Sequence, residues 1–324
     1  MKTLTYAQAL NEALAEELAK DPTMFIMGED IGVRGGPFKV TKDLYLKYPG
    51  QVIDTPISEN AITGMCYGAA ISGVKAVAEI MYSDFCLVGI DHIINSAAKA
   101  RTMFGGQITV PVVYRLPSGG GMQNAAQHSQ SLEALFCNVP GLKVVMPATP
   151  ADAKGLLKSA INDNNPVVFM EPRILYNIKG EVPEEEYCTP IGKGRLAREG
   201  KDVTIVATGN NVRKSLEAAD RLAQAGIDAE VIDLRTLVPY DKDIIRESVH
   251  KTGRLLVTHE AHEMYGVGGE IVSMICNDCF DDLDAPPMRY GSKFMPMPYN
   301  KELEAAVLPQ VEGIVDKVLQ IMRY

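Results

Sequence analysis

Glu59 stands between a stiffened loop and a run of small residues, an arrangement that suits a carboxylate presented to a ligand. The loop before it reads Asp-Thr-Pro-Ile-Ser, and Pro56 restricts its own backbone and that of Thr55. Residues 61–73 are rich in glycine and alanine, which allow another backbone or a flat ring to approach a helix closely. Two interpretations stay open: Glu59 presents its carboxylate to a flat ligand, or it complements the dipole at a helix N-terminus.

His128 is a second candidate, because it follows a glycine-rich stretch, residues 118–121, after an expected strand. Loops in this position form ligand crevices in open α/β sheets. The imidazole therefore either takes part in a site or is satisfied by hydrogen bonds in a packed turn. Ser129 lacks the Gly-x-Ser-x-Gly frame of a hydrolase nucleophile, so the pattern disfavours hydrolysis.

The segment Asn162–Pro166 is rich in side-chain oxygens and follows an expected helix at residues 151–161. The last carbonyls of a helix have no partner within the helix, and the Asn and Asp side chains add further oxygens. A monovalent cation fits such a loop, and so does a solvated helix end with an Asx turn.

Three other patterns indicate structure rather than chemistry. His259 and His262 do not have the spacing of the His-Glu-x-x-His motif, so we expect no metal there. Residues 266–270, Gly-Val-Gly-Gly-Glu, have the wrong spacing for a dinucleotide fingerprint and indicate a close contact between a helix and a loop. Cys276 and Cys279 lack a second pair or a histidine at zinc-finger spacing, so we expect packed thiols.

The composition is that of a globular protein. The 324-residue chain is 46% hydrophobic and 23% charged, which is enough for two domains with sizeable cores. Its net charge of −9 and its pI of about 5.2 argue against nucleic-acid binding. No apolar run approaches the length of a membrane span, and the N-terminus has no signal-peptide pattern. We therefore expect a cytoplasmic protein with no membrane partner, and the six scattered cysteines predict reduced thiols.

Hydrophobic periodicity predicts two α/β halves, and the first opens with a helix for which Thr5 and Gln8 form a possible capping box. In the first half we expect strands at residues 24–27, 75–80, 111–115, 143–146 and 167–170, with helices at 84–100 and 151–161. In the second half we expect strands at residues 203–207, 229–234 and 254–258, with helices at 212–225 and 242–249. This alternation predicts mostly parallel sheets covered on both faces, and hence an α/β fold of two doubly wound domains.

The boundary between the halves falls in a polar, acidic stretch from residue 179 to residue 187, followed by Gly192 and Gly194. We assign residues 1–178 to the first domain, 179–200 to a linker and 201–324 to the second domain.

Five segments together resemble the β subunits of the thiamine-diphosphate-dependent 2-oxo acid dehydrogenases. They are Thr55–Glu59, Ala125–Gln130, Pro140–Val145, Asp152–Leu156 and Asp233–Thr236. The resemblance covers essentially the whole chain, in order, and several long segments at matching separations are more specific than any single motif. It implies a pyrimidine-binding domain followed by a transketolase C-terminal-like domain, and it favours the ligand-facing interpretation of Glu59.

The resemblance also implies roles for individual side chains. Glu59 would hydrogen-bond a ring nitrogen of the cofactor's aminopyrimidine and share a proton with it. Phe85 would lie against the pyrimidine face, with Ile57 and Glu29 near the ring. His128 would position or protonate the intermediate or the incoming lipoyl group.

The cofactor site is incomplete in this sequence. Enzymes of this class hold the diphosphate through magnesium with a Gly-Asp-Gly motif, and the chain contains none. The resemblance therefore implies a separate α subunit that supplies magnesium, in a heterotetramer, and a lipoyl-bearing acyltransferase as acceptor. For potassium it implies a set of residues at the oxygen-rich loop and nearby: Val112, Ala160, Ile161, Asp163 and Asn165.

The substrate stays open at this point. Phe104-Gly105-Gly106 and the loop that carries His128 favour acetoin over pyruvate weakly, whereas Glu171–Tyr176 favours a branched-chain 2-oxo acid. A non-catalytic structural subunit is a further alternative, against which an intact Glu59 argues. Relatives commonly carry an aspartate shortly after the position of Gly291, whereas this chain has Ser-Lys-Phe at residues 292–294.

Overall fold

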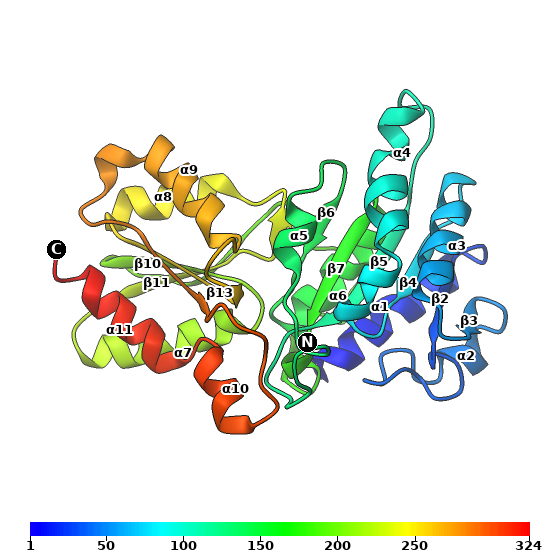
Figure 1. Cartoon of the computed structure of the whole chain (residues 1–324), viewed down its shortest axis with the longest axis horizontal. Coiled ribbons are helices and arrows are strands. Elements are labelled where there is room, and N and C mark those ends of the chain that lie inside the picture. The colour runs from blue at the N-terminus through cyan, green and yellow to red at the C-terminus, as the bar shows by residue number, and fades with distance from the viewer. The chain divides into compact units, whose positions relative to one another are not determined.

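The computed structural model describes residues 1–324, which divide into two compact units (Figure 1). Unit 1 comprises residues Met1–Ser118 and Leu135–Ile191, and unit 2 comprises Gly119–Ala134 and Gly192–Tyr324. The segment that carries His128 thus packs with unit 2, although it lies inside the sequence range assigned to the first domain. The boundaries at residues 178 and 200 stay predictions.

Unit 1 is built on parallel strands in the order β6-β7-β5-β4-β2-β3. These strands are β2 (Phe25–Glu29), β3 (Val52–Thr55), β4 (Ala76–Glu79), β5 (Val112–Ser118), β6 (Lys143–Val145) and β7 (Val167–Pro172), and a separate antiparallel pair is formed by β1 (Lys2–Thr5) and β8 (Lys179–Val182). The helices are α1 (Tyr6–Lys20), α2 (Leu44–Lys47), α3 (Glu59–Ile71), α4 (Ala98–Met103), α5 (Glu133–Cys137), which begins in the segment grouped with unit 2, and α6 (Pro150–Ile161).

Helices cover both faces of this sheet. Successive strand residues point to opposite sides, and apolar side chains on both sides must be buried. Val113 of β5 packs in a core cluster with residues of α1 and α6. Its neighbour Tyr114 lies on the other side, beside Cys66 and Tyr67 of α3. This two-faced burial explains why the strands read as nearly continuous apolar runs.

Local signals position the helices of unit 1. The predicted capping box is confirmed, because Gln8 N–H donates to Thr5 Oγ1 at 3.2 Å and Thr5 N–H donates to Gln8 Oε1 at 2.8 Å. The single helix expected at residues 84–100 is wrong in detail. The chain there forms a 3₁₀ segment (Ser83–Val88), a π segment (His92–Ala97) and then α4, and a further 3₁₀ turn spans Arg173–Leu175. The break is explained by close packing on α3, described below.

Unit 2 contains a sheet in the order β14-β13-β10-β11-β9, parallel except for β9. Its strands are β9 (Arg195–Arg198), β10 (Val203–Ala207), β11 (Ala229–Asp233), β13 (Leu255–His262) and β14 (Met288–Ser292), and β12 (Thr236–Val238) follows β11. Its helices are α7 (Asn210–Gln224), α8 (Lys242–Thr252), α9 (Gly268–Asp278), α10 (Lys301–Val307) and α11 (Val311–Ile321), with a 3₁₀ turn at Phe280–Asp282.

Figure 1 shows α7 and α11 on one face of this sheet and α8 and α9 on the other. Val203 and Ile205 of β10 pack in a core cluster with residues of α7 and α11. Thr204 between them points the other way and hydrogen-bonds Ser248 and Thr252 of α8 at 2.6 and 2.7 Å. The predicted α/β class with doubly wound units is therefore confirmed.

The glycine cluster at the start of α9 makes a close contact, but with a side chain of strand β13 rather than with a loop. A Cβ at Gly266 would lie 2.3 Å from the His259 ring, and one at Gly268 would lie 2.9 Å from the same ring. None of the helices is both long enough and apolar enough to cross a membrane.

Candidate functional site

Glu59 is the first residue of α3 and lies where the chain turns from β3 into that helix. The Ser58 hydroxyl caps the helix by accepting the Ala61 N–H at 3.4 Å, which fixes the entry of the chain. Only 8% of Glu59 is exposed. The side chain therefore sits at the carboxyl end of a parallel sheet, which is where open α/β folds bind ligands.

A second buried carboxyl lies beside it. Glu29 is the last residue of β2 and is paired in register with Thr55 of β3, so strand ends bring it toward the loop that carries Glu59. Glu29 is 6% exposed, and its Oε2 atom has no hydrogen-bond partner. Burial raises the pKa of Glu29, and the negative charges of Glu59 and Asp30 raise it further. Burial and the nearby negative charges thus both disfavour the ionised form of Glu29.

The start of α3 is held by very close packing from behind. The Thr63 hydroxyl bonds the Glu59 carbonyl at 2.8 Å and the Gly89 carbonyl at 3.2 Å. A Cβ at Gly89 would lie 2.6 Å from the Glu59 carbonyl oxygen, and one at Gly64 would lie 2.9 Å from the His92 ring. The predicted close approach of a backbone and a ring to this helix is thus confirmed, and it leaves Glu59 little freedom to move.

The other residues expected near the ring lie on the same segments. Ile57 is 78% exposed, two positions before Glu59, and therefore presents a free apolar side chain. Phe85 is half-buried in the 3₁₀ segment that leads to Gly89. Unit 1 thus places four of the predicted site residues on the β2 end, the loop before α3 and the 3₁₀ segment.

A buried ion cluster on β4, β5 and β7 was missed by sequence reasoning. Arg115 of β5 donates to Glu79 of β4 at 2.5 Å and to both oxygens of Glu171 of β7 at 2.7 and 2.9 Å. Tyr176 donates to Glu171 at 2.6 Å. Burial raises the pKa of Glu79 despite the opposing effect of Arg115. A charged residue inside each of three apolar strands was the available signal.

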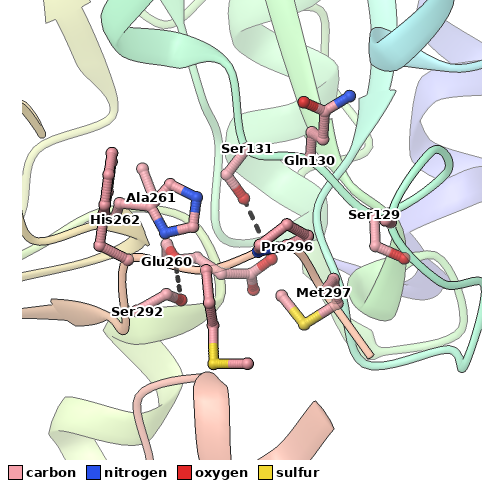
Figure 2. A pocket seen from close by; sticks show the side chains of 12 residues that line it. Ser129, Gln130, Ser131, Glu260, Ala261, His262, Ser292, Pro296 and Met297 are labelled. Carbon is pink, nitrogen blue, oxygen red and sulfur yellow. Dashed lines mark hydrogen bonds between the residues drawn. The ribbon is translucent and has the colours of Figure 1, made fainter. Parts of the chain in front are cut away.

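His128 belongs to unit 2, where it is half-buried in the loop from Gly119 to Ser131 and its N–H reaches the Ala125 carbonyl at 3.4 Å. The next residue, Ser129, is almost fully buried, and its hydroxyl has no partner. Figure 2 shows the pocket of about 310 Å³ that this loop borders. Its lining comes from the loop (Ala126, Ser129, Gln130, Ser131), from β13 (Glu260, Ala261, His262), from Ser292 of β14 and from the following Phe294–Met297.

Glu133 is a further buried acid that sequence reasoning did not single out. It is the first residue of α5, it is fully buried, and neither carboxylate oxygen has a hydrogen-bond partner of good geometry. Burial raises the pKa of Glu133 to about 7, the charge of Glu260 adds to this rise, and the main-chain N–H groups of Glu133 and Ala261 oppose it. Its position in a helix gives no sequence signal of such burial.

The oxygen-rich loop after α6 brings its predicted residues together. Ala160 and Ile161 are buried at the helix end, and Asp163 Oδ1 accepts the Asn165 N–H at 2.9 Å. Val112 begins β5, and the residues just before it contact this loop: Val110 N–H donates to the Asn164 carbonyl at 2.9 Å.

The other oxygen of Asp163 is ion-paired with Lys143. No group of three or more His, Cys, Asp or Glu side chains lies close enough to hold a metal ion. The amide oxygens of Asn162 and Asn165 accept hydrogen bonds from Lys75 and Arg101, so the main-chain carbonyls are the remaining donors for a hard cation.

Two domain families match the chain. The transketolase pyrimidine-binding domain matches residues 2–179, and the transketolase C-terminal domain matches residues 192–314. Pyruvate dehydrogenase E1 component subunit β-1 of Oryza sativa subsp. japonica is 47% identical over 97% of this chain and 85% of that protein. The pyruvate dehydrogenase E1 β subunit of Rhizobium meliloti is 46% identical over 98% and 70%, respectively. The chain belongs to the E1 β-subunit family of the 2-oxo acid dehydrogenases.

Other members of the E1 β-subunit family are also close. The 2-oxoisovalerate dehydrogenase β subunit of Bacillus subtilis is 44% identical over 94% of each chain. A solved structure of a split-gene transketolase, an inactive β4 tetramer, superposes with a TM-score of 0.81 at 23% identity and covers 99% of each chain, which shows the shared fold. The predicted family, fold and enzyme class are thus confirmed.

The E1 β-subunit family depends on thiamine diphosphate, and the residues of unit 1 fit that cofactor. Oε2 of Glu29 has no hydrogen-bond partner, and the carboxylate of Glu59 is buried near it. Both can accept hydrogen bonds, and an aminopyrimidine offers N–H groups that donate them. The exposed Ile57 offers an apolar contact for a ring.

Proposed function

We propose that this chain is the β subunit of an E1 component that decarboxylates pyruvate and passes the acetyl group to the lipoyl group of an acyltransferase. The observation that carries the proposal is the pair Glu29 and Glu59, buried at the carboxyl end of the sheet with one oxygen left without a partner. A buried polar atom without a partner costs free energy, so its retention supports a ligand that satisfies it.

Each of the four site residues of unit 1 has a definite role in this proposal. Glu59 would hold a ring nitrogen of the aminopyrimidine and exchange a proton with it, and the capped start of α3 fixes the main chain that carries it. Burial and the charge of Glu59 raise the pKa of Glu29, and its Oε2 atom, which has no partner in the chain, is available to the ring. Ile57 and Phe85 would flank the ring. Thiamine diphosphate, when bound, supplies the electron sink for cleavage next to the substrate carbonyl.

His128 is proposed to position the reacting group or to protonate it, or to act on the incoming lipoyl group. An imidazole is suited to this task because it gives and takes protons near neutral pH. Ser129 and Gln130, which follow it, border the pocket of unit 2, so the loop lies at the edge of an open space.

The α subunit is proposed to supply what this chain lacks. The sequence contains no Gly-Asp-Gly motif, so magnesium and the diphosphate are held by the partner in a heterotetramer. Potassium is proposed to bind in the loop after α6, through oxygens of Ala160, Ile161, Asp163 and Asn165, with Val112 nearby. The cytoplasm stays the proposed compartment, which imaging of a tagged chain in its own cell would test.

Pyruvate is proposed as the substrate because the relatives at 46–47% identity are named for it. The test is turnover by the co-purified α–β pair with pyruvate, acetoin and 2-oxoisovalerate. We expect the highest kcat/KM for pyruvate. A higher value for acetoin or for 2-oxoisovalerate would reassign the substrate without affecting the cofactor site.

The half-site is tested by cofactor titration. The chain alone should bind thiamine diphosphate weakly, and the α–β pair should bind it tightly in the presence of magnesium. Tight, magnesium-dependent binding by the chain alone would refute the division of the site between subunits.

A further inference from the structure

The loop from Gly119 to Ser131, which we call the histidine loop because it carries His128, has an unusual backbone. Four of its residues have positive φ angles: Gly119 (87°), Gly121 (90°), Gln123 (52°) and Ala125 (61°). The last two have side chains that disfavour this conformation, so local preference does not select it. Interactions from outside the loop must therefore hold its shape.

Glu304 provides the first of these interactions. It lies on α10 and is only 2% exposed. Its Oε1 accepts the Gly121 N–H at 2.9 Å, and its Oε2 accepts the Gln123 N–H at 3.0 Å. Both oxygens of one buried carboxylate are thus used on the histidine loop, and hydrogen bonds to an ionised acceptor are the strong ones. Asn300 caps the start of α10, the helix that carries Glu304, by accepting the Leu303 N–H at 3.0 Å.

Glu260 of β13 provides the second. Its Oε1 accepts the Gly120 N–H at 2.7 Å and the Ser131 hydroxyl at 3.3 Å, and Figure 2 shows the latter contact. A Cβ at residue 119 would lie 2.3 Å from this oxygen, so the approach requires Gly119. Gly119 N–H donates to the Gln130 carbonyl at 3.1 Å and closes the base of the loop.

We propose that Glu304 and Glu260 are positioning residues that hold the histidine loop in the conformation in which His128 acts. Together the two carboxylates bind the main-chain N–H groups of residues 120, 121 and 123, and they reach them from two different elements. The proposal rests on the role assigned to His128 under the proposed function. Neither glutamate touches the reacting atoms in this scheme.

The variant that tests the proposal is Glu304→Gln, with Glu302→Gln as its matched control. A glutamine at residue 304 keeps one acceptor oxygen and turns an NH₂ group toward a main-chain N–H, so two donors face each other. Glu302 lies on the same helix, is exposed, and makes no hydrogen bond or ion pair with the histidine loop. Its substitution removes the same charge and leaves the loop contacts intact.

Amide hydrogen exchange in the α–β pair reads out the loop directly. We expect exchange at residues 120–123 to rise about tenfold or more in Glu304→Gln, because a lost charge-assisted hydrogen bond lowers local opening stability by at least that factor. Glu302→Gln should match the unsubstituted chain. Unchanged exchange in Glu304→Gln would overturn the proposal. If that variant fails to fold, Glu260→Leu, which removes the acceptor of the Gly120 N–H, carries the same test with the same two outcomes.

A double-mutant cycle then separates positioning from a structural role. We expect Glu304→Gln to lower kcat with pyruvate about tenfold, because a small displacement of the loop misplaces His128, while the affinity for thiamine diphosphate stays unchanged. In a chain that already carries His128→Ala, the second substitution should have little further effect. If instead the two substitutions lowered kcat independently, so that the loss in the double variant equalled the product of the single losses, the proposal would be overturned. A fully active His128→Ala would instead refute the role of His128, and the exchange experiment would still report on the loop.

Discussion

Two groups of buried carboxylates in unit 1 differ in how completely they are satisfied. Around Arg115, the acids Glu79 and Glu171 accept hydrogen bonds from a guanidinium and a tyrosine hydroxyl, on neighbouring strands. Glu29 ends β2 and Glu59 begins α3; the charge of Glu59 acts on Glu29 with no cation between them, and Oε2 of Glu29 has no partner.

The difference separates a structural cluster from a site. A fully paired buried cluster holds strands together, whereas a buried acid with an unused oxygen is costly and is retained where a ligand satisfies it. The following substitutions test this distinction, because it predicts losses of stability in the first group and losses of activity in the second.

Glu59→Gln should give the largest effect. We expect turnover of the α–β pair to fall by about 100-fold to 10,000-fold, the range for loss of a proton-transferring group. The tetramer should still assemble, and thermal stability should not fall, because a buried charge is removed. Steady-state kinetics and size-exclusion chromatography measure both. Glu185→Gln, at an exposed acid of the same unit, is the control, and near-normal turnover in Glu59→Gln would sink the proposed proton relay.

Arg115→Met should act on stability instead. Removing the shared partner leaves Glu79 and Glu171 buried without a cation, which costs about 3–5 kcal/mol of unfolding free energy. Urea unfolding of the chain measures this. Adding Glu79→Gln and Glu171→Gln should restore part of the loss, because the uncompensated charges are removed. If Arg115→Met were as stable as the unsubstituted chain but bound the cofactor more weakly, the cluster would belong to the cofactor site instead.

Glu133→Gln should change the pH dependence of stability. The folded pKa of Glu133 is raised from 4.5 to about 7, so its protonated form is favoured in the folded state. Its stabilising contribution is complete below pH 4.5 and is lost as the pH rises to 7. Relative to the unsubstituted chain, the variant should therefore gain up to about 3 kcal/mol between pH 4.5 and pH 8.

Unfolding curves at several pH values test the prediction for Glu133. Glu302→Gln, at an exposed acid of unit 2, should show no such gain. If the unfolding free energies of Glu133→Gln and the unsubstituted chain changed in parallel with pH, the Glu133 carboxylate would have hydrogen-bond partners in solution. Glu133 would then be a structural acid.

Potassium should give the smallest effect. The ammonium of Lys143 is already paired with Asp163, so a potassium ion in the loop adds to a charge that is partly compensated. Replacing sodium with potassium at constant ionic strength should stabilise the chain by less than about 1 kcal/mol, given the partly exposed pair. Lys143→Met should enlarge the response. A melting temperature that is the same in both salts, in both variants, would contradict the cation site.

Much of the architecture follows from local sequence. The Thr5–Gln8 box begins α1 as expected, and apolar runs such as residues 203–207 form strands where they are predicted. These features depend on interactions between near neighbours, which the sequence shows. Residues 84–100 were predicted less well, because their helix is divided where Gly89 and His92 are pressed against α3. That packing involves residues distant in sequence, so periodicity does not reveal it.

The sequence by itself determined the family and named Glu59 and His128 as candidates, because long segments at matching separations and a stiffened loop are visible in one dimension. Only the tertiary structure showed that Glu29 carries an unsatisfied oxygen, that Arg115 joins Glu79 to Glu171, and that Glu304 binds the histidine loop from α10. The physical reason is that burial and hydrogen-bond satisfaction depend on which strand ends and helices meet. A glutamate in a sequence has the same letter whether its oxygens are solvated, paired or left without a partner.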